Sequence, residues 1–121
     1  MSRRLERVAE EIREEVARLL VREIKDPRIG FVTVTRVSVT PDLHVARVFV
    51  GVLGDATQRK RSLDALKHSA GYMRRLVGQG LRLRFAPELH FSYDEGLDAT
   101  DRVAQLLDEA HAAAPPDDSE R

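Results

Sequence analysis

The chain has 121 residues, which is enough for one domain with a single modest core and too few for two. Apolar residues make up 42% and charged residues 33%, an ordinary balance for a soluble globular protein, and the lack of cysteine excludes disulfides and thiolate metal sites. No apolar run approaches membrane-spanning length and the first residues contain no apolar signal region, so we expect a cytoplasmic protein that does not bind membranes.

The first predicted element is a helix over residues 2–25. Ser2 is its predicted N-cap, and Asp26-Pro27 is its predicted end, because the residue before a proline is forced out of the α region. Charged residues of both signs lie between the apolar ones and predict a solvated outer face. The apolar residues that recur at helical spacing are Leu5, Val8, Ile12, Val16, Leu19 and Ile24.

Two strands joined by a tight turn are predicted next. Residues 31–39 and 44–53 are both rich in β-branched residues, and residues 40–43 between them place Pro41 at the first central position of a turn. In the second strand the even-numbered residues 46–52 share one face, which we assign to the core. Valines occur on both faces of the first strand, so the sequence leaves its orientation open.

A bent pair of helices is predicted after the hairpin. Residues 55–58 resemble a capping box at its start, and apolar spacing continues through the Ser-Ala-Gly of residues 69–71, which predicts a bend there rather than a stop. Gly78 and Gly80 are predicted C-terminal stop signals. The apolar residues predicted to share the buried side are Leu63, Leu66, Ala70, Met73 and Val77.

A third strand and an acidic tail complete the chain. Residues 88–94 alternate apolar and polar side chains, and a last helix is expected to start at Asp98. Residues 112–121 are small, acidic and interrupted by proline, and are expected to be disordered. The elements predict an α+β fold of two layers over residues 1–111, in which helices cover one face of a three-stranded sheet.

The formal net charge of zero conceals a strong asymmetry. Residues 59–84 contain eight Lys or Arg and one acid, whereas residues 85–121 contain two basic and ten acidic residues. Such an asymmetry is a hint of nucleic-acid binding, although a solvated helix face followed by a charged tail explains the counts equally well. On a helix, the cations form a stripe on roughly the side opposite the apolar residues. Its two rows are Lys60, Lys67 and Arg74, and Arg61, His68, Arg75 and Arg82.

Several short motifs occur together in a specific order. They are Asp26-Pro27-Arg28, Val32-Thr33-Val34-Thr35-Arg36-Val37, Asp42-Leu43, Ala46-Arg47-Val48, Ser69-Ala70-Gly71, Leu83-Arg84, and Pro87-Glu88-Leu89 with Phe91 and Asp94. No single motif is diagnostic, but in this order and spacing they resemble the ribosome-binding factor A family over nearly the whole folded part of the chain.

The resemblance implies a fold and a partner. It implies a type II KH-like fold with the order α-β-β-α-(kink)-α-β plus a C-terminal helix, and a non-enzymatic role in late maturation and 5′-end processing of the 16S rRNA of the small (30S) ribosomal subunit. The family is also associated with growth in the cold. Residues 69–71 would take the place of the GxxG loop of other KH domains, with Ser69 where the family has alanine.

The predicted RNA-binding site combines cations that neutralise phosphates with backbone that a partner approaches closely at Gly71. Backbone and shape are expected to dominate recognition, because most of the aromatic residues are assigned to the core. Tyr72 is the best candidate for stacking on a base, with burial the favoured interpretation, and Gly71 also fits a helix crossing that needs a small residue. The predicted site residues are Arg28, Lys60, Arg61, Lys67, Ser69, Gly71, Arg74, Arg75, Arg82 and Arg84.

Two other classes of function fit parts of the sequence. Glu88, His90 and Asp94 share a strand face, but Asp94 is more than about 10 Å from His90 along a strand; we interpret them as solvated and expect no catalysis, metal, cofactor or small-molecule substrate. The alternative to RNA binding is a protein-interaction module whose arginine stripe binds an acidic partner. The favoured prediction is a monomer that binds the small ribosomal subunit.

Overall fold

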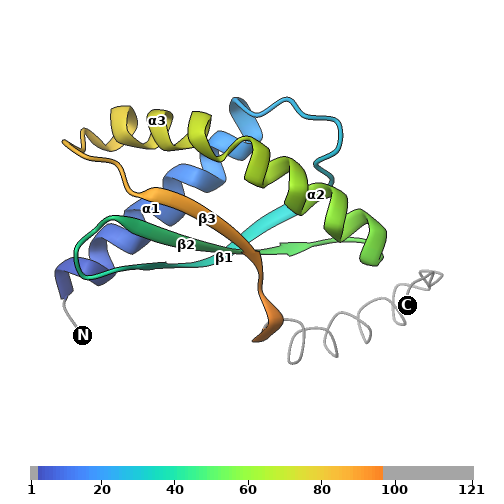
Figure 1. Cartoon of the computed structure of the whole chain (residues 1–121), viewed down its shortest axis with the longest axis horizontal. Coiled ribbons are helices and arrows are strands. Elements are labelled where there is room, and N and C mark those ends of the chain that lie inside the picture. The colour runs from blue at the N-terminus through green and yellow to red at the C-terminus, as the bar shows by residue number, and fades with distance from the viewer. Residues whose placement is uncertain (1–2, 97–121) are drawn as a thin grey trace.

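The computed structural model describes residues 3–96, which form three helices and three strands (Figure 1). The elements are α1 (Arg3–Arg22), β1 (Val32–Val39), β2 (Val45–Val52), α2 (Ala56–His68), α3 (Ala70–Leu81) and β3 (Glu88–Tyr93). The sheet order is β1-β2-β3, with β1 antiparallel and β3 parallel to β2. The α+β fold with a bent pair of helices between the second and third strands is therefore confirmed. Ser2, the helix expected from Asp98 and the tail over residues 112–121 lie outside the described residues.

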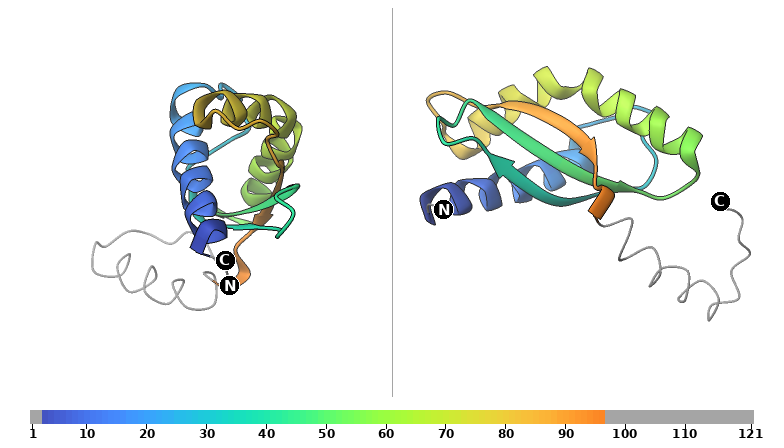
Figure 2. Two further views of the ribbon diagram at one scale, coloured as in Figure 1. Left: turned by 90° about the vertical axis from the view of Figure 1, so that its left-hand side faces the viewer. Right: turned by 60° about the horizontal axis from the view of Figure 1, so that its bottom comes forward.

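The core lies between the sheet and the helices, which all cover the same face (Figure 2). Alternate residues of β2 and the apolar positions of the helices meet there, as the periodicity of the sequence predicts. The fully buried apolar side chains are Ile12, Val16, Ala46, Val48, Val50, Ala65, Leu66, Met73 and Val77. α3 packs against both α1 and β3, so it is held from two sides while its remaining surface faces solvent.

The orientation of β1, which the sequence left open, is set by a β-bulge. The register against β2 shifts between Val34 and Arg36. Val32 and Val34 pack toward the core before the shift, and Val37 and Val39 do so after it. A bulge inserts one residue and reverses the alternation of side chains. The even-numbered valines before the bulge and the odd-numbered valines after it therefore reach the same face of the sheet.

The first helix ends earlier than predicted. α1 ends at Arg22, and the backbone N–H groups of Glu23 and Ile24 both donate to the carbonyl of Leu19, at 2.8 and 3.2 Å. This closure satisfies the helix end and turns Ile24 back to pack against the core. The prediction of helix as far as Lys25 is wrong because the end is formed by this closure and not by the proline.

The end of α3 also differs from the prediction. The helix continues through Gly78 and Gly80 to Leu81, and Arg82 takes the left-handed conformation that usually falls to glycine, with φ 55° and ψ 43°. The two glycines serve packing instead. A Cβ at Gly78 would lie 3.1 Å from the Cβ of Ala86, and a Cβ at Gly80 would clash with the carboxylate of Glu15 on α1.

Candidate nucleic-acid interface

The two helices that carry most of the predicted site meet at Ser69. This residue, with φ −88° and ψ −1°, ends α2 and precedes α3. Its N–H donates to the carbonyls of Ala65 and Leu66 at 3.0 and 3.1 Å, and its own carbonyl accepts from the N–H of Met73 at 3.0 Å. The chain therefore changes direction with no intervening loop. The bend predicted within residues 69–71 is confirmed, and the break between the helices is at Ser69.

The surface of α3 is open at Gly71. The residue lies in the first turn of α3, is exposed, and has no atom within 4 Å of the position that a Cβ would occupy. Its φ is not in the positive range that favours glycine. Neither the backbone conformation nor a helix crossing explains a glycine here, so the interpretation of Gly71 as a packing residue is wrong. The helix backbone is left accessible to a partner.

A groove runs between α3 and residues 83–86, which fold back along the helix. The N–H of Leu83 donates to the carbonyl of Gly78 at 2.9 Å, and Nε of Arg74 donates to the carbonyl of Ala86 at 2.9 Å. The space between them is an open groove of about 620 Å³. Its lining residues are Gly71, Arg74, Arg75, Gly78, Gln79, Leu83, Arg84 and Ala86.

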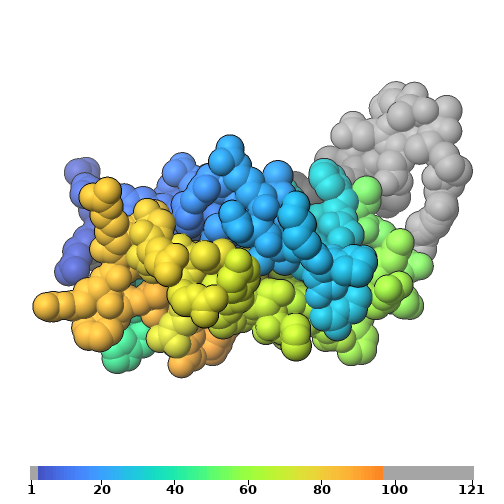
Figure 3. Space-filling view, turned by 90° about the horizontal axis from the view of Figure 1, so that it is seen from above, coloured from blue at the N-terminus to red at the C-terminus, as the bar shows by residue number. Residues whose placement is uncertain are grey.

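Four of the predicted site residues meet in this groove: Gly71, Arg74, Arg75 and Arg84. The other six lie outside it, at the helix junction, along α2, at the end of α3 and in the loop before β1. Seen from above, residues 83–86, α3 and α2 follow one another along one edge of the helical face, with α1 beside them (Figure 3). The predicted site is thus an elongated strip with one concave part.

The cations of this strip differ in how freely they face solvent. Lys60 pairs with Asp64 at 3.1 Å. Within the part of the chain that the structure describes, six others have no ion-pair partner, and these are Arg61, Lys67, Arg74, Arg75, Arg82 and Arg84. A cation with no internal partner does not have to break an ion pair before it contacts a phosphate.

Arg28 is held in the loop before β1. Its backbone N–H and its guanidinium both donate to the carboxylate of Asp26, at 2.8 to 3.2 Å. The Arg28 side chain, followed by its backbone N–H, lowers the pKa of Asp26 from 3.8 to about 2. The buried Ser62 of α2 donates to the carbonyl of Arg28 at 3.3 Å, so this arginine lies beside α2, away from the groove.

The aromatic residues are more exposed than predicted. Phe91 is buried, but the exposed fraction is 73% for Phe31, 79% for Phe85 and 42% for Tyr72. The expectation that Tyr72 is buried is therefore wrong. The sequence did not identify Phe85 as a surface residue because most of the aromatic side chains were assigned to the core, and only the neighbouring arginines of the segment signalled exposure.

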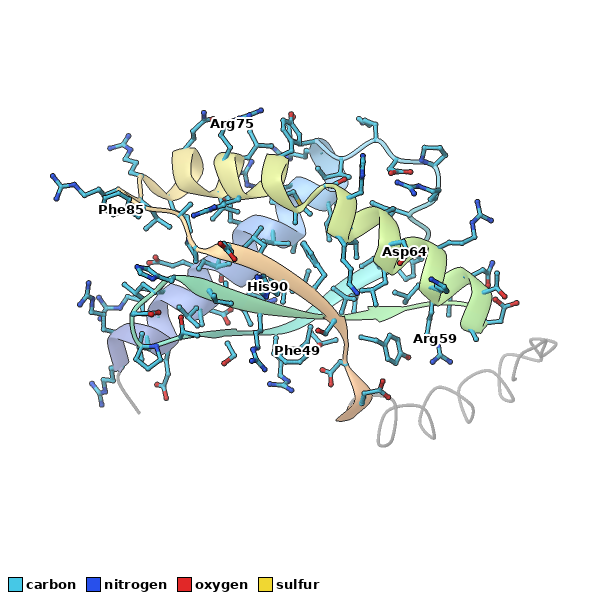
Figure 4. All side chains as sticks on the ribbon, in the orientation of Figure 1. Phe49, Arg59, Asp64, Arg75, Phe85 and His90 are labelled. Carbon is cyan, nitrogen blue, oxygen red and sulfur yellow. The ribbon has the colours of Figure 1, made fainter. Side chains whose placement is uncertain are left out.

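The strand face considered for catalysis does not form one cluster. Nε2 of His90, which is labelled in Figure 4, lies 3.1 Å from a carboxylate oxygen of Glu88, and both residues are exposed. Asp94 is only 6% exposed; it accepts a hydrogen bond from the hydroxyl of Thr35 at 2.5 Å and lies 3.8 Å from Nε of Arg36. The interpretation of Asp94 as solvated is wrong, because the bulge brings Thr35 onto it. Residues 3–96 contain no group of three or more His, Asp or Glu suited to a metal ion, and none of their helices could cross a membrane.

The element order, the kinked helix pair and the basic strip beside it define a KH-like module. Residues 4–107 match the family model of ribosome-binding factor A. The chain is 51% identical over 112 residues to a ribosome-binding factor A of Desulforamulus reducens, covering 93% of each chain. It therefore belongs to the ribosome-binding factor A family.

Solved structures agree with this assignment. The solution structure of a candidate ribosome binding factor A from Thermotoga maritima superposes with a TM-score of 0.71 and 32% identity, over 83% of this chain and 95% of that one. The Thermus thermophilus RbfA homology model fitted into a cryo-EM map of a 30S–RbfA complex gives a TM-score of 0.61 at 22% identity, over 75% and 92% of the two chains. The latter likeness supports the fold.

Proposed function

We propose that the protein binds the free small (30S) ribosomal subunit through its 16S rRNA and assists late maturation and 5′-end processing without catalysing a reaction. Family membership supports the partner, as does the 30S complex of the Thermus thermophilus relative. The observation that carries the proposal is the groove on α3, where Arg74, Arg75 and Arg84 converge beside the open backbone of Gly71.

The groove fits a sugar-phosphate backbone. Arg74 is already fixed by the carbonyl of Ala86, so it loses less side-chain freedom when it contacts a phosphate. The empty space over Gly71 lets the RNA backbone approach the helix. Contacts to phosphates carry no sequence information, so particle shape would select the site and salt would weaken binding.

The remaining predicted residues extend the contact beyond the groove. Three cations along the same strip would bind further phosphates, and these are Arg61, Lys67 and Arg82. Ser69 would act through the bend that it forms between the two helices. Lys60 and Arg28 would first have to exchange an internal carboxylate for a phosphate, so we assign them a smaller share. We further propose that the protein acts as a monomer in the cytoplasm, and that residues 1–111 suffice for binding.

Charge reversal in the groove tests the proposal. Arg74→Glu/Arg75→Glu should abolish co-sedimentation with 30S subunits in a sucrose gradient and reduce the slope of log affinity against log salt by about 1.4 to 1.8, at 0.7 to 0.9 per phosphate. Arg7→Glu/Arg47→Glu is the matched control, because it changes the charge equally at exposed residues outside the groove.

The same experiment separates RNA binding from the protein-interaction alternative. If the Arg74/Arg75 variant still travels with 30S subunits as the wild type does, the groove is not the interface. If nuclease treatment of the particles leaves wild-type binding unchanged, the partner is an acidic protein surface and the RNA proposal fails.

A further inference from the structure

Phe85 is a large apolar side chain held at the surface beside the groove. The residue is 79% exposed, and Figure 4 shows it beyond the end of α3. The segment that carries it is anchored on both sides, by the hydrogen bond from Leu83 to Gly78 and by the one from Arg74 to Ala86. The ring is therefore held by a fixed segment of backbone in an exposed position where it contributes little to the core.

A second flat surface lies beside the groove, at Arg75 and Tyr72. Arg75 lines the groove, and its guanidinium lies 5.3 Å from the centre of the Tyr72 ring. Tyr72 is 42% exposed, so the arginine and the ring together present a stacked pair to solvent. Aromatic rings and arginine planes are the surfaces on which proteins stack unpaired bases of RNA.

We infer that the groove binds single-stranded RNA, with phosphates between Arg74, Arg75 and Arg84 and an unstacked base on the exposed ring of Phe85. The inference rests on the proposed function and deepens it, because it names which form of RNA the groove recognises. A second base would stack on the Tyr72–Arg75 pair. The protein would then recognise RNA through stacking on its bases as well as through its phosphates and shape.

The chemistry of the groove favours single-stranded RNA over the other partners. In an A-form duplex the bases are stacked inside the helix and offer no free face to a ring at the protein surface. None of the residues that line the groove is acidic. A protein partner that covered Phe85 with an apolar pocket would also have to desolvate the neighbouring Arg84, which is costly without a paired carboxylate.

Binding of three RNA probes to Phe85 variants tests the inference. The probes are a single-stranded oligonucleotide of about ten nucleotides, the same strand with abasic sites, and a hairpin duplex of equal charge. Phe85→Leu should weaken binding of the intact single strand by about tenfold. Affinity for the abasic strand and the duplex should change by less than about twofold, and the salt slope should stay the same, since no charge is removed.

Two further variants control for folding and for exposed aromatic surface in general. Phe85→Tyr retains the ring and should restore wild-type affinity. Phe31→Leu truncates a similarly exposed side chain outside the groove and should bind all three probes as the wild type does.

Two results would overturn the inference. The first is that Phe85→Leu binds the intact strand as tightly as the wild type does, or loses affinity equally for all three probes. The second is that Phe85→Leu loses 30S binding while its affinity for the single strand is unchanged, which would make Phe85 a protein contact. If Arg74→Glu/Arg75→Glu still loses 30S binding in these cases, the proposed function stands without the inference. If that charge reversal also has no effect, both fail.

Discussion

Replacement of Gly71 by alanine should have opposite effects on folding and on binding. It should raise the free energy of unfolding and lower the affinity for RNA. Glycine inside a helix is less stable than alanine by about 0.5–1 kcal/mol. Gly71 lies in the first turn of α3, so we take the lower value, about 0.5 kcal/mol. The new methyl group enters empty space, since no atom lies within 4 Å of it. For a domain of this size the gain corresponds to a rise in Tm of about 2–4 °C.

The same methyl group should weaken RNA binding. It would occupy the space through which a sugar-phosphate backbone approaches the helix beside Arg74 and Arg75. Displacement of one phosphate contact costs about 1–1.5 kcal/mol, which is roughly a five- to tenfold loss of affinity. Gly71→Leu should weaken binding further while leaving the fold largely intact.

The assay is a thermal melt followed by circular dichroism, together with a binding titration against 30S subunits. Gly80→Ala is the matched control, because it also replaces a glycine of α3. Its Cβ would meet the carboxylate of Glu15, the end of a flexible side chain that must shift, and the gain from alanine in a helix offsets that cost, so we expect a net change of less than about 1 kcal/mol in the free energy of unfolding and unchanged affinity. A Gly71→Ala protein that melts below the wild type, or that binds as tightly, would refute the reasoning.

Three further predictions concern single carboxylates and their partners. Asp64→Asn frees Lys60 and should tighten RNA binding at low salt, with a steeper salt slope by up to about 0.7; weaker binding would contradict it. The pKa of Asp26 is lowered to about 2, so its stabilising contribution is present above about pH 4 and is lost as the pH falls toward 2. Urea midpoints of the wild type and Asp26→Asn should therefore converge over that range, and parallel curves would oppose this. Thr35→Val removes the hydroxyl that donates to the buried Asp94 and should lower stability by about 1–2 kcal/mol in urea, whereas an unchanged midpoint would show that the bulge does not depend on it.

The elements that the sequence predicts well are those that local chemistry determines. Both hydrogen bonds of the predicted capping box form between Asp55 and Gln58, each from the backbone N–H of one residue to the side chain of the other. The sequence predicts them because the two residues are only three positions apart. The core face of β2 follows from strict alternation along one strand. The proline turn closes with the N–H of Leu43 donating to the carbonyl of Thr40 at 2.8 Å. None of these features depends on a distant part of the chain.

The features that sequence analysis missed depend on contacts between distant residues. The orientation of β1 depends on a bulge where Thr35 meets Asp94, 59 residues further along the chain. The cations of the strip were predictable because they repeat on helices, but the groove was not. It exists because residues 83–86 fold back onto α3 and Arg74 binds Ala86, which no periodicity encodes.

The glycines of α3 support the proposal that this helix forms the interface. Three of its 12 residues are glycine, and each leaves room for a different neighbour. Gly80 admits Glu15 of α1 and Gly78 admits Ala86, whereas the space at Gly71 is empty. Each glycine costs the helix about 0.5–1 kcal/mol, and for two of them a contact within the protein explains the cost. The third has no such contact in the described structure, and a bound RNA backbone is the neighbour that would explain it.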